Sequence, residues 1–330
     1  MAGAALAFAR ASFAIGLILI FGAAAEAQQV LKWNMPTPYA DGSFHTKNTR
    51  QFADDIRAAT NGRLDITVHS NGSLFKLPDI KRAVQTGQVP IAETNLPTHG
   101  NEYPFFEVEV ILFLVKNYDD AAKLWTLSRP YVEKRLSDQG MRVLYVVPFP
   151  GMGMISKKAV TKLDDLKGSK FRSFGPAATR FASAVGATPT TIQASELSQA
   201  FTMGIVDSML TSSTTGVATQ AWDYAKYFID VNAAHSKDTI IINEASFKGL
   251  PEDIRQAILT AAAAAEVRGL EWSRREDEET KARLVKEGMT IIKPDAAFQA
   301  ELQKLGIVLA EDWEKRAGAD GTKVLNEFRK

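Results

Sequence analysis

The side chains that most often perform catalysis occur in this chain, but not at catalytic spacing. Its four histidines show neither an HExxH pattern nor any other close ligand spacing; they are His45, His69, His99 and His235. No serine lies in a GxSxG turn. The acidic pairs Asp119-Asp120 and Asp164-Asp165 precede predicted helices, where negative charge stabilises the helix dipole. Gly151-Met152-Gly153 lacks the third glycine of a dinucleotide fingerprint. The sequence therefore predicts no enzyme, no metal site and no cofactor.

Composition narrows the classes of protein further. The 330 residues contain 39 Lys and Arg against 38 Asp and Glu, a formal net charge of +1, which excludes a general nucleic-acid binder. The absence of cysteine excludes disulfide scaffolds, thiolate zinc sites and cysteine nucleophiles. With 45% hydrophobic and 23% charged residues, the chain is typical of a globular protein with one large or two moderate domains.

The first 27 residues have the pattern of a secretory signal. The apolar run Phe13–Phe21 follows Arg10, and Ala25-Glu26-Ala27 is a small-x-small cleavage pattern. The alternative is a retained membrane anchor, but the apolar run is shorter than the roughly 20 residues that span a bilayer. No later stretch reaches that length without charges. We therefore expect a periplasmic protein whose mature chain does not insert stably into a membrane.

Predicted strands alternate with predicted helices along the rest of the chain. Strands are predicted at Val30–Met35, Leu64–Ser70, Val89–Thr94, Met141–Val147, Met152–Ser156, Lys170–Phe174, Val206–Leu210 and Thr239–Asn243. Ser43 is a candidate N-cap of the first helix, and Pro251 precedes a very long helix from Glu252 to about Glu287. The alternation predicts an α/β fold with mostly parallel strands, and the long helix predicts an element that bridges two lobes.

Three consecutive motifs resemble a known family. Leu163–Arg172 is similar to DLKGxKxR, Val185–Glu196 to GAxPTxxxxSE, and Ala200–Asp207 to ALxxGxVDG. These are motifs of the TRAP-transporter solute-binding proteins of the DctP type. The likeness extends to Asn61-Gly62, to Asn71-Gly72 and to the helix after Leu250-Pro251.

The resemblance implies a two-lobed periplasmic-binding-protein fold of the type II-like kind, with a hinged cleft. We expect lobe I to comprise residues 28–148 plus about 239–280. Lobe II then comprises 149–238 plus about 281–330. Such a protein captures a small ligand between its lobes and delivers it to the subunits of a TRAP membrane permease.

The resemblance also singles out Arg172 as the ligand anchor, since the Arg of that motif pairs with a ligand carboxylate in the family. A planar guanidinium matches both oxygens of a carboxylate and stays charged at any relevant pH. From the sequence alone, an Arg at the end of a strand is more often part of a surface ion pair.

The chain departs from the family pattern at three places. Pro150–Gly153 contains no Arg where sugar-acid binders often carry a second one, Ala194 replaces an aromatic residue, and Thr211 stands where the family has Asn. These changes predict a roomier and less polar pocket. Further candidates to line it are Phe149, Met152, Phe174, Trp222, Ala194, Thr211, Ser212, Tyr39 and Asn95. The aromatic residues are alternatively core residues, and the hydroxyls alternatively belong to an ordinary polar loop.

The predicted function is capture of a small organic acid, with an aromatic or other apolar-bodied monocarboxylate favoured. A C4-dicarboxylate or a 2-oxo acid is the alternative ligand and requires a second polar anchor. Two other classes stay open: an exported enzyme, which predicts a titratable pair with perturbed pKa values in the cleft, and a sensor ligand-binding module.

Overall fold

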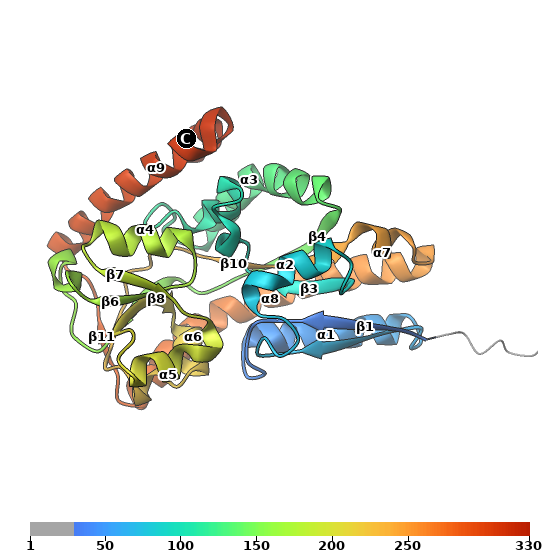
Figure 1. The fold of residues 1–330 in the computed structure, drawn as a ribbon, viewed down its shortest axis with the longest axis horizontal. Coiled ribbons are helices and arrows are strands. Elements are labelled where there is room, and N and C mark those ends of the chain that lie inside the picture. The colour runs from blue at the N-terminus through green and yellow to red at the C-terminus, as the bar shows by residue number, and fades with distance from the viewer. Residues whose placement is uncertain (1–29) are drawn as a thin grey trace, which may run out of the picture.

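The computed structural model describes residues 30–330, so the predicted signal segment of residues 1–27 lies outside the described residues. No helix of this described part is long and apolar enough to cross a membrane. The fold is α/β, as predicted, and its strands form two lobes that lie side by side (Figure 1).

The part that we call lobe I carries a three-stranded sheet of order β3-β10-β4 and a parallel pair of strands, β1 and β2. The Ser43 side chain accepts a hydrogen bond from His45 N and caps the first helix, as predicted. The elements of lobe I are β1 (Leu31–Pro36), α1 (Phe44–Ala59), β2 (Leu64–His69), α2 (Leu77–Gln85), β3 (Ile91–Thr94), the 3-10 helices η1 (Leu96–His99) and η2 (Pro104–Val110), α3 (Tyr118–Asp138), β4 (Met141–Pro148), β10 (Lys237–Asn243) and α7 (Glu244–Lys248).

The part that we call lobe II is built on a six-stranded sheet of order β11-β9-β5-β8-β6-β7. Its elements are β5 (Met152–Ser156), η3 (Leu163–Leu166), β6 (Lys170–Ser173), α4 (Pro176–Ala184), β7 (Thr188–Thr191), η4 (Ala194–Glu196), α5 (Leu197–Thr202), β8 (Ser208–Ser212), α6 (Ser213–Ala218), η5 (Ala221–Asp223), β9 (Tyr227–Ile229) and β11 (Thr290–Ile292).

The prediction of mostly parallel strands was wrong. Strand β10 runs antiparallel to β3 and β4, and β5 runs antiparallel to β8 and β9. With β5 and with β10, the chain enters the sheet of one lobe directly after crossing from the other lobe. They therefore run against their neighbours, and the apolar pattern of a strand does not encode that direction.

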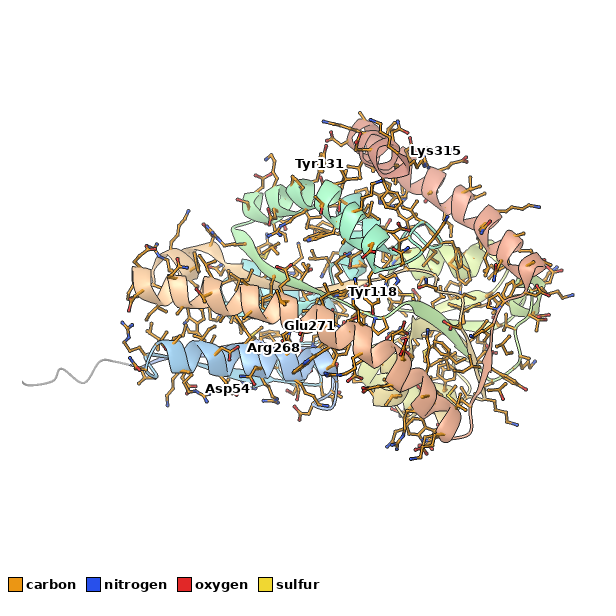
Figure 2. The ribbon with its side chains drawn as sticks, turned by 180° about the vertical axis from the view of Figure 1, so that it is seen from behind. Asp54, Tyr118, Tyr131, Arg268, Glu271 and Lys315 are labelled. Atoms are coloured by element: carbon orange, nitrogen blue, oxygen red, sulfur yellow. The ribbon has the colours of Figure 1, made fainter. Side chains whose placement is uncertain are left out.

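The predicted bridging helix is present as α8 (Glu252–Lys286), 35 residues long. It packs on α1 and β4 of lobe I and on α6 of lobe II. Figure 2 shows it crossing the back of the molecule, with Arg268 lying toward α1, where its guanidinium donates to Asn48 Oδ1 at 2.7 Å. Gly269 allows α8 to pack closely on β4, because a Cβ at this position would lie only 2.6 Å from Val147 Cγ2. The bridge is thus held firmly to lobe I.

The last helix, α9 (Ala296–Arg329), contributes to both lobes. Its first turns bury Phe298 and Leu302 in a core of lobe II, whereas Trp313 and Leu325 belong to a core of lobe I. The chain changes direction at Gly318, whose φ of 68° is a left-handed value. The lobe boundaries expected from the sequence, including 281–330 as part of lobe II, stay a prediction.

An ion pair at the start of α7 gives a pH-dependent prediction for stability. Arg142 donates two 2.8 Å hydrogen bonds to Glu244, and this lowers the pKa of Glu244 from its ordinary 4.5 to about 2. The pair therefore stabilises the fold above pH 4.5 and loses its effect as the pH falls toward 2. We expect Glu244→Gln to lower the free energy of unfolding by about 1 kcal/mol at pH 7, since both side chains are partly exposed.

Urea unfolding at pH 7, 4 and 3 tests this expectation. The difference between the parent and Glu244→Gln should shrink as the pH falls. The matched control is Glu278→Gln, an exposed residue, which should change stability by less than about 0.5 kcal/mol at every pH. If the difference in the free energy of unfolding between the parent and Glu244→Gln stays constant with pH, the Arg142–Glu244 pair is not its source.

Candidate functional site

A cavity of about 750 Å³, including its mouth toward solvent, lies between the two lobes. Lobe I and the crossing segments contribute one wall, and the ends of β5, β6 and β8 with the loop before α5 contribute the other. The strands β6 and β8 are parallel, so their carboxyl ends open at the same edge of the sheet. Clefts between two lobes are a preferred place for small-molecule sites.

Arg172 is the charged group of the lobe II wall. Side chains alternate along β6, so that Phe171 enters the lobe II core and Arg172 faces the cavity. Arg172 is only 6% exposed. Its Nε donates a hydrogen bond to the Ile192 carbonyl at 2.9 Å, and its guanidinium lies 5.6 Å from the centre of the Phe174 ring. Burial lowers the pKa of Arg172 to about 10, so it is still a cation at neutral pH.

Among residues 30–330, no acceptor contacts the two terminal nitrogens of Arg172. Within residues 30–330, no carboxylate lies at ion-pair distance from Arg172, and its only protein hydrogen bond is the one from Nε. An unpaired buried charge is costly, because it has lost its water without gaining a partner. Both terminal nitrogens are therefore free to donate to a group in the cavity.

The opposite wall contains polar side chains held by a buried acid of β10. Asn95, which is 5% exposed, lies with its Nδ2 3.2 Å from the Lys237 carbonyl and 3.3 Å from Asp238 Oδ1. The Tyr39 hydroxyl donates to the same Asp238 oxygen at 2.8 Å. Both Asn95 and Tyr39 line the cavity, while Asp238 lies behind them.

Aromatic and aliphatic side chains complete the cavity. Phe149, Met152, Phe174, Leu77 and Leu210 line it. The Phe149 ring is fixed by its neighbours, with ring centres 5.6 Å from Tyr39 and 4.0 Å from His45. The interior of the cavity therefore offers the Arg172 guanidinium, a few hydroxyl and amide groups, and a largely apolar surround.

Most of the residues proposed from the sequence gather at this one cavity. Those that line it are Tyr39, Asn95, Phe149, Met152, Arg172, Phe174, Ala194, Thr211 and Ser212. Trp222 is not among the residues that line it; its half-buried ring packs against a core of lobe II, 5.9 Å from the Arg283 guanidinium. The roles of the nine lining residues in ligand binding stay a proposal.

Several lining residues were not expected from the sequence. They include Pro38, Lys76, Leu77, Gln193, Ser195, Thr215 and Ser236. Ser195 lies inside the Val185–Glu196 motif and could have been found there. The position of Ser236 at the cavity instead depends on how β10, the next element, pairs in its sheet. Lys76 is exposed at the mouth, so the cavity has a second cation at its rim, which the sequence reading did not place.

A buried titratable cluster lies behind the lobe I wall. Asp238 Oδ2 is 3.2 Å from His45 Nδ1, and Glu93 Oε1 is 3.8 Å from the same nitrogen. Burial raises the pKa of Glu93 to about 7 and that of Asp238 well above its usual range, and it lowers the pKa of His45. In the described part of the chain, this is the set of side chains that could hold a metal ion, since their ligand atoms lie within 4.8 Å of one another. None of the three lines the cavity.

Two α/β lobes, a ligand-sized cavity between them and a helix across both define a two-lobed solute-binding protein. The chain belongs to the bacterial extracellular solute-binding proteins of family 7, the DctP family, whose profile matches residues 37–316. It is thus a TRAP-transporter solute receptor, a class that binds small organic acids outside the cytoplasm and works with a membrane permease. The family and its structural neighbours are receptors and not enzymes.

Solved structures of this class are closely similar. DctP7 of Bordetella pertussis, a receptor binding pyroglutamic acid, is 42% identical, with a TM-score of 0.89, over 91% of this chain and 100% of that one. DctP6 of the same organism, also binding pyroglutamic acid, is 38% identical, with a TM-score of 0.89, over 90% and 99% of the chains. A marine metagenome receptor specific for pyroglutamate is 37% identical, with a TM-score of 0.89, over 91% and 99%.

Proposed function

We propose that this receptor captures pyroglutamate, or a monocarboxylate of the same compact shape, by pairing its carboxylate with Arg172. The observation that carries the proposal is the buried guanidinium that faces the cavity without a protein carboxylate beside it. Three relatives at 37–42% identity that bind pyroglutamate support the choice of ligand.

The energy of the pairing is sufficient for tight binding. A charge-assisted hydrogen bond contributes roughly 1.5–3 kcal/mol. Two such bonds from Arg172 supply a large part of the roughly 8 kcal/mol that a micromolar Kd requires. The two methylene groups of the pyroglutamate ring can lie against Phe149, Met152 and Phe174.

A second candidate is a true aromatic monocarboxylate, which the sequence reading favoured. The specific observation for it is the apolar surround of Phe149, Met152 and Phe174. A C4-dicarboxylate is the third, because Lys76 at the mouth could face a second carboxylate.

We further propose that residues 1–27 direct export to the periplasm and that the loaded receptor docks on the subunits of a TRAP permease. A sensor module would present the same cavity to a signalling partner instead. Ligand-dependent uptake by vesicles that contain a TRAP permease distinguishes transport from sensing.

A thermal-shift screen on ligand-stripped protein tests the ligand. The mature chain is unfolded in urea, dialysed and refolded, because the marine metagenome receptor was found with co-purified pyroglutamate. Pyroglutamate at 100 times its Kd should stabilise the protein by about 2.7 kcal/mol, or roughly 5–10 °C in Tm.

Benzoate, succinate and 2-oxoglutarate are tested separately in parallel wells and represent the alternative ligand classes. A larger shift with benzoate replaces pyroglutamate by the aromatic candidate and leaves the Arg172 pairing in place. A shift with succinate alone points to the Lys76 rim as a second anchor. No shift with any carboxylate contradicts the proposal.

A further inference from the structure

Asn95 lines the cavity with its amide nitrogen turned away from it. The two Nδ2 hydrogens face Ser236 Oγ at 3.1 Å, the Lys237 carbonyl at 3.2 Å and Asp238 Oδ1 at 3.3 Å. No donor within residues 30–330 reaches Asn95 Oδ1, yet this oxygen is not among the enclosed atoms that lack a partner. The free oxygen therefore opens toward the cavity that Asn95 lines.

The chemistry of the neighbours fixes this orientation of the amide. A backbone carbonyl such as that of Lys237 can only accept a hydrogen bond. Rotating the amide by 180° would put Asn95 Oδ1 against the Lys237 carbonyl, now 3.2 Å from Nδ2, with no hydrogen between the two oxygens. The Ser236 hydroxyl can donate or accept and therefore tolerates either orientation. The nitrogen must therefore point toward β10 and the oxygen toward the ligand.

Tyr39 has its hydrogen committed in the same direction. Its hydroxyl donates to Asp238 Oδ1, and burial beside that acid raises the pKa of Tyr39 well above 10, so the proton stays in place. Asp238 is 0% exposed and lies behind both side chains. It is thus a positioning residue that draws the hydrogens of Asn95 and Tyr39 away from the cavity.

The two buried groups, Arg172 and Asn95, consequently have opposite hydrogen-bonding character. Arg172 on lobe II can only donate, and Asn95 Oδ1 on lobe I can only accept. The Thr211 hydroxyl can do either, so it does not discriminate between ligands. A ligand that joins the lobes must offer a carboxylate to one wall and a hydrogen to the other.

We infer that the receptor selects monocarboxylates that carry an N–H or O–H donor on the body of the molecule, facing Asn95, and that it rejects their oxo and ether counterparts. The inference rests on the proposed function, because it assumes that Arg172 takes the carboxylate. It names the chemistry of the group next to the carboxylate: a lactam N–H or a hydroxyl. A keto oxygen or a second carboxylate at that position would face Asn95 Oδ1 with no hydrogen between them.

Matched ligand pairs test the inference by isothermal titration of the stripped mature chain. In the first pair, pyroglutamate is compared with 5-oxotetrahydrofuran-2-carboxylate, the lactone in which a ring oxygen replaces the N–H. The other pairs are 2-hydroxy acids and 2-oxo acids of the same carbon skeleton, such as lactate and pyruvate. We expect the donor-bearing member to bind at least about 100-fold more tightly, since a site built for an N–H or O–H strongly rejects the analogue without it.

Three variants assign the discrimination to its residues. Asn95→Leu removes the acceptor and should reduce the ratio of affinities to less than about 10-fold. Asp238→Asn is the conservative control: it keeps an Oδ1 that can accept from Asn95 and Tyr39, so the ratio should stay within about threefold of the parent while the melting curve still shows a folded protein. Arg172→Lys should weaken both members of a pair by the same factor and leave the ratio unchanged.

The outcomes separate this inference from the proposed function. Equal binding of lactam and lactone overturns the inference, while pyroglutamate binding stands. Tighter binding of a 2-oxo acid or a dicarboxylate overturns the inference and also replaces the proposed ligand. If no acid of the panel binds, both fail. If Asp238→Asn proves unfolded, the ratio in Asn95→Leu alone decides.

Discussion

Replacing Arg172 by Gln is expected to weaken binding of the carboxylate ligand by about 100-fold to 10,000-fold. The change removes the two terminal guanidinium donors, and each charge-assisted bond contributes roughly 1.5–3 kcal/mol. Arg172→Lys should retain part of the affinity, because it keeps the charge but not the planar fork. Isothermal titration with pyroglutamate measures both variants.

The same substitution is expected to leave the empty protein folded and nearly as stable. Arg172 has no carboxylate partner among the described residues, so its loss breaks no ion pair and removes an unpaired buried charge. The melting temperature of ligand-free Arg172→Gln should therefore lie within about 3 °C of the parent or above it.

Lys170→Gln is the matched control, since Lys170 is exposed at the start of the same strand. It should change the affinity by less than about threefold. An Arg172→Gln variant that binds as tightly as Lys170→Gln would show that the anchor lies elsewhere.

Replacing Trp313 by Ala is expected to cause the largest loss of stability. Trp313 is 1% exposed, its Nε1 donates to the Pro104 carbonyl at 2.7 Å, and its ring lies edge-on to Phe105 at 5.3 Å between centres. A buried Trp to Ala change costs about 3–5 kcal/mol through lost burial and the cavity left behind. The melting temperature should fall by roughly 10 °C.

Val308→Ala on the same helix is the control for this prediction. Val308 is 58% exposed, so its truncation should change the free energy of unfolding by less than about 0.5 kcal/mol. A Trp313→Ala protein that melts within 2–3 °C of the parent would show that the second half of α9 does not hold lobe I together.

The parts of the fold that depend on local pattern could be predicted from the sequence. The helix α8 was expected from Glu252 to about Glu287, because Pro251 starts it and no further proline occurs before Pro294, and it ends at Lys286. Arg172 could be singled out because the motif around it is continuous in sequence. Strand direction could not, since the apolar residues of β5 and β10 are the same whichever way the strand runs.

The hydrogen-bonding character of the cavity also lay beyond the sequence. Asn95 and Asp238 are 143 positions apart and meet only because β3 and β10 pair with Thr94 opposite Thr239. Lys76 was missed for a similar reason, because its place at the mouth depends on how the loop before α2 faces lobe II. Trp222 was proposed from its type alone, and its ring packs with a lobe II core instead.

A crystal structure of the mature chain grown with pyroglutamate tests the central claim most directly. The predicted result is one ligand between the lobes, with both carboxylate oxygens about 2.7–2.9 Å from the terminal nitrogens of Arg172. The lactam N–H should point to Asn95 Oδ1. A ligand whose carboxylate meets Lys76 at the mouth, with the Arg172 nitrogens still without an anionic partner, would contradict the account.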